Sequence, residues 1–162
     1  MDLLGHSYGG ICSLEAVALG IPALRRLVLY EPPVPVGADF IDMPMIEDMK
    51  GWLAAGERER IVETFVLRQV RAPQAELDLM RADLSWANRV AAAHTIPREL
   101  AEVGGGYRPN AAGIAAIGVP TRILLGSEST DYLAAGARHL AETIPGAELV
   151  VLEGHAHNAM NT

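Results

Sequence analysis

The sequence has a single cysteine, Cys12, and fewer basic than acidic residues. One cysteine excludes an internal disulfide and a cysteine-rich zinc cluster, and it fits a reducing compartment, so we expect a cytoplasmic protein. Cys12 itself is expected to pack on a helix face. With 13 Lys and Arg against 20 Asp and Glu, the formal charge of −7 argues against a nucleic-acid partner.

Long apolar runs are also missing from the sequence. None approaches the roughly 18 residues that a membrane span requires, and the N-terminus lacks the basic and apolar regions of a signal peptide. We therefore expect no membrane span. Half of the 162 residues are nevertheless apolar, which suffices for a core of ordinary domain size.

The start of the chain alternates between strand-like and helix-like segments. Residues 2–4 and 26–30 are expected to be strands, with a tight turn and a helix between them that Gly20 and Pro22 terminate. A short apolar strand that directly follows a helix gives a βαβ crossover. Such units build parallel sheets with helices on their faces, so the predicted fold class is α/β.

A Pro-rich segment, residues 31–37, interrupts this alternation. From about residue 38 to 103 the apolar residues keep helical spacing, which predicts several short helices in an insertion. The run Gly104-Gly105-Gly106 is interpreted as a flexible linker. A phosphate loop would need a preceding strand and a following helix start with Lys and Ser or Thr.

The alternation returns after residue 119, with expected strands at 120–126 and 148–152 around a helix at 132–143. The predicted organisation is therefore a sheet with flanking helices, interrupted by a helical cap. The sheet domain is assigned to residues 1–36 and 114–162, and the cap to residues 37–113.

Gly5-His6-Ser7-Tyr8-Gly9 is a G-x-S-x-G sequence between a strand and a helix, which is the context of a nucleophile elbow. The elbow strains its serine, so we expect Gly5 and Gly9 to relieve backbone clashes. The Ser7 hydroxyl would project above the sheet. The Tyr8 N–H, at the helix N-terminus, would donate to the oxyanion of a tetrahedral intermediate. The alternative is a chance turn in which Ser7 caps the helix.

A serine nucleophile needs an imidazole within hydrogen-bond reach to accept its proton. Of the five histidines, His6 is expected to pack beside the nucleophile, and His94 and His139 fall in predicted helices. His155 and His157 follow the last expected strand. Such a His-x-His pair also occurs in metal sites, but no third ligand lies at an obvious spacing, so neither a metal nor a cofactor is predicted.

The elbow, the strand exit Leu29-Tyr-Glu-Pro-Pro33, the helical insertion and the terminal histidines together resemble the cap-bearing α/β-hydrolases over essentially the whole chain. In this family the base follows the last strand in the chain order Ser, acid, His. Aligning the family's glycine with Gly154 implies that His157 is the base. His155 is the alternative.

The triad acid is less clearly marked by the resemblance. Family members usually carry an aspartate at the position of Ser129. A branch of the family places its acid after the earlier strand, where this sequence has Glu31, which would orient the base and stabilise its imidazolium. We favour Glu31 and keep Glu128 and Asp131 as alternatives.

The resemblance implies a serine hydrolase that cleaves an ester or related acyl bond of a small, apolar molecule through an acyl-enzyme. Serine members are esterases, lipases, carbon–carbon bond hydrolases or cofactor-free perhydrolases. A set of apolar cap residues would either wall an acyl pocket or form the cap core, which is the expectation for most of them. They are Trp52, Phe65, Leu67, Met80 and Trp86.

The family comparison also implies a C-terminal fragment. The chain begins where the family's fifth strand ends, so earlier strands and the loop that donates the first oxyanion N–H have no counterpart. An N-terminal signal would lie in that missing part. The competing hypothesis is therefore a non-catalytic ligand-binding protein or an inactive fragment.

Overall fold

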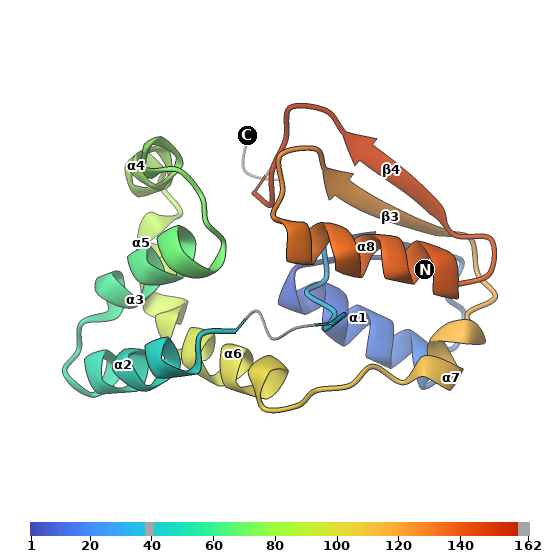
Figure 1. Ribbon diagram of the computed structural model, residues 1–162, viewed down its shortest axis with the longest axis horizontal. Coiled ribbons are helices and arrows are strands. Elements are labelled where there is room, and N and C mark those ends of the chain that lie inside the picture. The colour runs from blue at the N-terminus through green and yellow to red at the C-terminus, as the bar shows by residue number, and fades with distance from the viewer. Residues whose placement is uncertain (38–40, 159–162) are drawn as a thin grey trace. The chain divides into compact units, whose positions relative to one another are not determined.

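The structure of the protein is a computed structural model that describes residues 1–37 and 41–158. The chain divides into two compact units, drawn in Figure 1, one comprising Met1–Ala38 with Arg108–Thr162 and the other Asp39–Tyr107. Each unit has its own hydrophobic core.

The first unit is built on a parallel sheet with the strand order β1-β2-β3-β4. Each strand lies beside its predecessor, and right-handed crossovers then place the connecting helices on one face. The predicted α/β class is confirmed. The strands are β1 (Asp2–His6), β2 (Arg26–Tyr30), β3 (Thr121–Gly126) and β4 (Glu148–Leu152), and the helices are α1 (Tyr8–Ala18), α7 (Ala111–Ala115) and α8 (Asp131–Thr143).

The core of the first unit lies between the sheet and these helices. Leu14 of α1, Leu29 of β2, Ile123 of β3 and Leu140 of α8 are all fully buried in it. Burying one such side chain contributes about 1.5–3 kcal/mol relative to leaving it in water. The alternating pattern of the strands thus turns one row of apolar residues toward the helices and fixes the sheet register.

Helix α1 carries the cysteine on its outer side. Ile11 and Leu14, three residues apart, share the buried face of the helix. Cys12 points away from that face and is exposed. The expectation that Cys12 packs on a helix face is therefore wrong.

The second unit is helical. Its first helix begins at a capped end, where the Asp42 side chain accepts from Met45 N–H at 3.0 Å. Within the described ranges, no helix of the chain is both long and apolar enough to cross a lipid bilayer. The helices of the unit are α2 (Met43–Ala54), α3 (Arg58–Thr64), a π-helix (Phe65–Gln69), α4 (Gln74–Ala82), α5 (Trp86–Ala92), a 3₁₀ helix (Ala93–Thr95) and α6 (Ile96–Gly104).

The core of the second unit is formed by fully buried residues such as Met45, Ile46, Met49 and Ile61. All five apolar residues considered above as a possible acyl pocket lie in this core or against it. They are Met80 within the core and Trp52, Phe65, Leu67 and Trp86 packed on it.

The first residue of the glycine run is part of a helix, where a linker was expected. Gly104 is the last residue of the helix. A Cβ at this position would lie 2.8 Å from Ile41 Cγ2 and 2.9 Å from Met43 Sδ. The interpretation of Gly104 as part of a flexible linker is therefore wrong, because Gly104 belongs to a helix and packs closely on Ile41 and Met43.

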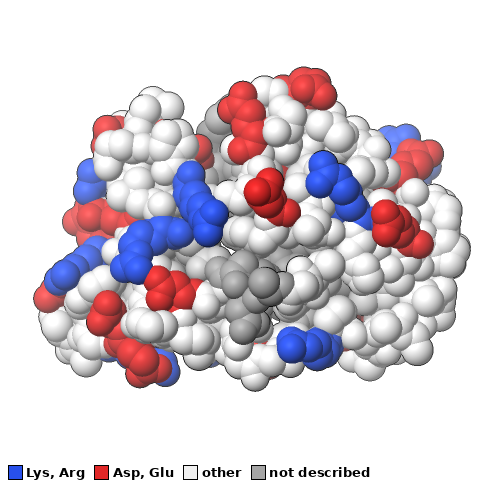
Figure 2. All heavy atoms as spheres, viewed as in Figure 1, with Lys and Arg blue, Asp and Glu red and all other residues white. Residues whose placement is uncertain are grey.

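Basic and acidic side chains are intermixed on the face shown in Figure 2. Several form exposed ion pairs, such as Lys50 with Glu47 at 2.7 Å and Arg122 with Glu148 at 2.9 Å. Exposed pairs of this kind contribute at most about 1 kcal/mol each, so they add little to the stability that the two cores supply.

Candidate active site

Ser7 lies in the tight turn between β1 and α1, with φ 54° and ψ −128°. Positive φ is strained for a residue with a side chain. The turn folds back so closely that a Cβ on Gly5 would lie 2.5 Å from Ser13 Oγ and 2.7 Å from Gly9 O. The elbow therefore requires glycine at position 5.

The second glycine requirement falls one residue later than expected. A Cβ on Gly9 would have no heavy atom within 4 Å outside its own helix turn, so the expected role of Gly9 is wrong. A Cβ on Gly10 would instead lie 2.9 Å from Pro32 Cβ and 3.3 Å from Gly5 O. Gly10 lets α1 approach the segment that follows β2.

The structure brings Ser7, His157 and Glu31 into one hydrogen-bonded chain. His157 Nδ1 lies 2.7 Å from Glu31 Oε2, and His157 Nε2 lies 2.9 Å from Ser7 Oγ. A carboxylate only accepts, so Nδ1 carries the proton and donates. In the neutral ring Nε2 then has a lone pair, and it accepts from the Ser7 hydroxyl.

Glu31 directly follows β2 and is completely buried. Its Oε1 accepts from Gly126 N–H at 2.7 Å and from Ser129 Oγ at 2.5 Å. Burial by itself raises the pKa of Glu31, but hydrogen bonds from His157, Ser129 and Gly126 and the charge of His157 together lower that pKa below its ordinary value. The carboxylate is therefore ionised at neutral pH.

The segment after Glu31 is held between two helices through small residues. Gly10 of α1 approaches Pro32 as described above, and on the other helix, α8, a Cβ on Gly136 would lie 3.2 Å from Val34 O and 3.3 Å from Pro32 O. Glu31 itself has a positive φ of 44°. Packing on both sides fixes this strained residue with its carboxylate toward His157.

The alternatives raised by the sequence lie outside this network. Glu128 and Asp131 are exposed, and so is His155, whose carbonyl accepts from Glu128 N–H at 2.9 Å. In the described part of the chain, no three His, Cys, Asp or Glu side chains gather in an arrangement that could hold a metal ion.

Tyr8 is the first residue of α1, a helix of 11 residues. The first backbone N–H groups of a helix point outward at its positive end, where they favour negative charge. The Tyr8 N–H thus belongs to the turn that presents Ser7, at a place suited to an oxyanion.

Sequence reasoning did not assign a function to Ser129, whose hydroxyl donates to Glu31. It also missed that His6 and Tyr30 hydrogen-bond to the backbone of the segment carrying His157. Tyr30 ended an expected strand, but His6 was expected in the turn after residue 4, whereas the structure extends β1 to His6 and pairs it with Tyr30.

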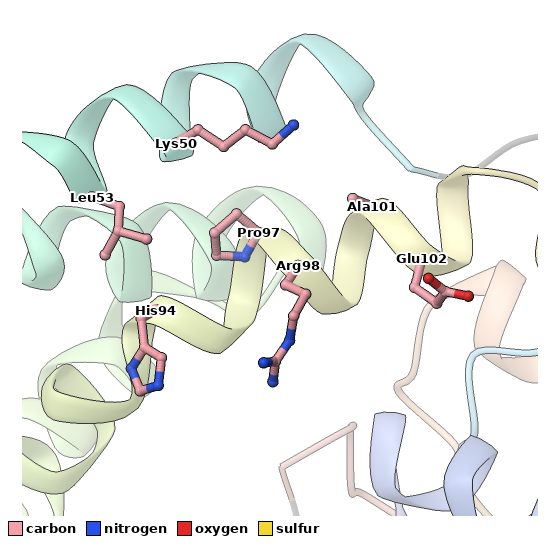
Figure 3. A pocket seen from close by; sticks show the side chains of 7 residues that line it. All are labelled: Lys50, Leu53, His94, Pro97, Arg98, Ala101 and Glu102. Atoms are coloured by element: carbon pink, nitrogen blue, oxygen red, sulfur yellow. The ribbon is translucent and has the colours of Figure 1, made fainter.

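A pocket of ≈ 450 Å³ lies in the second unit, between α2 and α6, with His94 of the 3₁₀ helix at its edge (Figure 3). All its lining residues belong to that unit, so it contains no member of the hydrogen-bonded chain described above. The lining residues are Lys50, Leu53, His94, Pro97, Arg98, Ala101 and Glu102.

Comparison with known families gives one match, to the model described as the alpha/beta hydrolase family, over residues 2–162. No curated protein matches the chain. The matched range includes every residue of the hydrogen-bonded chain at the elbow.

Solved structures also resemble the chain. An alpha/beta hydrolase from Sphaerobacter thermophilus is 30% identical with a TM-score of 0.77, over 97% of this chain and 63% of that one. An esterase from Exiguobacterium antarcticum is 21% identical with a TM-score of 0.69, over 96% and 59%. The 2-hydroxy-6-oxo-6-phenylhexa-2,4-dienoate hydrolase of Rhodococcus sp. strain RHA1 is 17% identical with a TM-score of 0.66, over 98% and 58%. The last two likenesses concern the fold alone, and this chain spans about three fifths of each structure's length.

Proposed function

This chain belongs to the alpha/beta hydrolase family, and on that premise we propose that its site hydrolyses an ester or related acyl bond of a small molecule. The observation that carries the proposal is the chain of hydrogen bonds from Ser7 through His157 to Glu31, with separations of 2.9 Å and 2.7 Å. A serine, an imidazole and a buried carboxylate in this order are the groups that activate a hydroxyl as a nucleophile.

In the first half-reaction, Ser7 Oγ attacks the substrate's carbonyl carbon while its proton passes to His157 Nε2. The carbonyl π electrons move to the oxygen, and the Tyr8 N–H donates to the resulting oxyanion. Glu31 stabilises the imidazolium. The bond to the leaving group then breaks, the leaving oxygen takes the proton from Nε2, and an acyl ester remains on Ser7.

In the second half-reaction, water attacks the acyl ester and transfers a proton to His157 Nε2. The tetrahedral intermediate collapses, the Ser7 oxygen leaves with the proton from the imidazolium, and a carboxylic acid is released. Glu31 keeps the proton of the neutral ring on Nδ1 throughout, so that Nε2 remains the atom that exchanges protons with Ser7 and substrate.

The proposal also concerns the substrate, namely the size and polarity of its acyl group. Structures of similar fold include an esterase and a 2-hydroxy-6-oxo-6-phenylhexa-2,4-dienoate hydrolase, so the fold accommodates more than one substrate. An ester is the simplest substrate for the groups present, because a serine, a base and an acid suffice without a cofactor. We propose a small and apolar acyl group.

The proposal is tested with p-nitrophenyl acetate, butyrate and octanoate, comparing the parent chain with Ser7→Ala and Glu31→Gln. We expect turnover of the shorter esters, loss of turnover to the uncatalysed rate in Ser7→Ala, and a fall in kcat of about 10²- to 10⁴-fold in Glu31→Gln. Glu128→Gln and Asp131→Asn are the matched controls and should stay within about twofold of the parent, since an exposed carboxylate outside the network stabilises no imidazolium.

Ester turnover that survives Ser7→Ala would overturn the assignment of the nucleophile. A loss in Glu128→Gln or Asp131→Asn equal to that in Glu31→Gln would overturn the assignment of the acid.

A further inference from the structure

Two side chains hold consecutive carbonyl groups of the segment that carries His157. His6 Nε2 lies 2.8 Å from His157 O, and the Tyr30 hydroxyl donates to Ala156 O. A carbonyl oxygen only accepts, so His6 Nε2 carries a proton and donates it. Both contacts are thus made by a side-chain donor to the main chain of the base segment.

The arrangement follows from the sheet register. His6 is the last residue of β1, Tyr30 is the last residue of β2, and the two are paired across the parallel ladder. Paired residues of neighbouring strands project from the same face. Their rings accordingly stack, with centroids 4.9 Å apart and an interplanar angle of 26°. Tyr30 is almost fully buried, so its hydroxyl has a fixed position.

His157 needs support of this kind because it lies outside the regular elements. Strand β4 ends at Leu152, and His157 follows in a turn. Main-chain hydrogen bonds join Ser127 N–H to Leu152 O and Glu128 N–H to His155 O, which anchors the segment as far as residue 155. The two carbonyls held by His6 and Tyr30 are those of the next two residues.

The His6 ring also lies against the base itself, with its centroid 4.7 Å from that of the His157 imidazole and an interplanar angle of 42°. The His6 side chain therefore holds His157 in two ways: it donates to the main-chain carbonyl, and its ring packs against the imidazole. A displacement of about 1 Å in a reacting group can cost on the order of 100-fold in rate, so this contact bears on reactivity.

We infer that His6 and Tyr30 are positioning residues that fix the imidazole of His157 between Ser7 and Glu31. The expected effect on the reaction rate rests on the proposed function. Its geometric part concerns the His157–Glu31 hydrogen bond and can be measured without turnover. His6 acts through its hydrogen bond and its ring, and Tyr30 acts through its hydroxyl.

The test uses variants of the whole chain that separate donor from ring. His6→Phe keeps an aromatic ring and removes the donor, His6→Gln restores an N–H near the position of Nε2, and Tyr30→Phe removes only the hydroxyl. His139→Phe, at an exposed histidine of α8, is the matched control. Near-ultraviolet circular dichroism shows which variants are folded. If His6→Phe does not fold, the test is made with Tyr30→Phe and His6→Gln.

Two readouts are followed for each variant. The first is the downfield proton resonance of the His157 Nδ1–H donated to Glu31, and the second is the rate of labelling by a fluorophosphonate. We expect the resonance to shift or broaden and labelling to slow about tenfold in His6→Phe and in Tyr30→Phe. His6→Gln should recover the resonance and label within about threefold of the parent, and His139→Phe should match the parent.

The inference is overturned if folded His6→Phe and Tyr30→Phe keep the parent resonance and labelling rate. It is also overturned if His6→Gln is as impaired as His6→Phe, because the hydrogen bond would then be irrelevant. If the parent does not label at all, the proposed function fails, and the resonance alone decides the positioning. A resonance that is lost in His6→Phe and recovered in His6→Gln supports the inference. A resonance that is absent from the parent, or that is unchanged in His6→Phe, contradicts it.

Discussion

At the scale of single residues, the buried carboxylate of Glu31 is held by donors on both of its oxygens. Oε2 accepts from His157, and Oε1 accepts from Gly126 N–H and Ser129 Oγ. Ser129, which follows β3, thus supplies a hydrogen bond to a carboxylate that follows the neighbouring strand β2. A carboxylate with these donors is stabilised in its charged form.

Replacing Ser129 by alanine removes one donor from a buried charge. We expect Ser129→Ala to lower the free energy of unfolding by about 1.5–3 kcal/mol and to raise the pKa of Glu31 relative to that in the parent chain. Urea unfolding at neutral pH measures the first effect. Ser127→Ala is the control, since its hydroxyl accepts from Gly154 N–H and has no charged partner. An equal or larger loss in the control would contradict the account.

The pH dependence of stability follows from the lowered pKa of Glu31. Because the folded-state pKa lies below the unfolded one, the carboxylate adds stability that is fully present above the ordinary glutamate value of about 4.3. That stability is lost as the pH falls through the folded-state value. The difference in unfolding free energy between the parent and Glu31→Gln should therefore shrink as the pH falls below the ordinary glutamate pKa and through the folded-state pKa of Glu31. A difference that stays constant with pH would refute this.

The sequence indicated Ser7 from the elbow, and the family resemblance indicated His157 through its alignment at Gly154, but three candidate acids were left. The choice among carboxylates depends on which one the fold buries against the imidazole. Glu128 lies closer to the expected position along the chain, yet it is exposed, whereas Glu31 is buried. Contacts between distant segments decide this, and they do not appear in local patterns. The catalytic roles themselves stay predictions.

At the scale of elements, the segment from Glu31 to Val34 is wedged between α1 and α8 by Gly10 and Gly136. A side chain at Gly10 would meet Pro32 at 2.9 Å, and one at Gly136 would meet main-chain oxygens at 3.2–3.3 Å, so both helices lie tightly against this segment. The position of the carboxylate is therefore set by helix packing on both sides of it, in addition to its own hydrogen bonds.

Adjacent glycines of α1 give a matched pair of substitutions. Gly10→Ala should be destabilised by about 1–3 kcal/mol and should label slowly with a fluorophosphonate, because the new methyl group displaces Pro32 and with it Glu31. Gly9→Ala should be at least as stable as the parent, since its Cβ meets open space and alanine favours helix. Thermal unfolding and labelling rates measure both. Equal effects of the two substitutions would contradict the packing argument.

Most elements of the first unit were predictable, with β2 and β4 at their expected bounds and β3 and α8 within one residue of theirs. Their apolar alternation and turn residues are strong local signals. Helix α7, Ala111–Ala115, was missed because four small residues and one isoleucine carry no periodicity. The role of Gly9 was predicted wrongly because the G-x-S-x-G motif places glycine at that position whatever the local packing. The tight contact at Gly10 is with Pro32, which lies more than twenty residues away in the chain.

At the scale of the whole molecule, two units have separate cores, and the three residues of the proposed triad all belong to the first. The two-part organisation expected from the sequence rests on the Pro-rich exit and the change to helical spacing. We keep the assignment of a sheet domain and a helical cap as a proposal.

A pair of core substitutions distinguishes the units. Ile123→Val in the first core and Ile61→Val in the second each remove one fully buried methyl group, at a cost of about 0.5–1.5 kcal/mol. Fluorophosphonate labelling of Ser7 is measured along a urea titration. We expect Ile123→Val to shift the loss of labelling to lower urea, with a smaller shift for Ile61→Val. Equal shifts would show that the two cores unfold as one.

The central claim is that Ser7 is a nucleophile activated by His157, and intact-mass measurement after fluorophosphonate treatment tests it most directly. The account predicts a single adduct on the parent chain, mapped to Ser7, and none on Ser7→Ala or His157→Ala under the same conditions. An adduct that persists in Ser7→Ala, or a parent chain that circular dichroism shows to be folded and that forms no adduct, would contradict it.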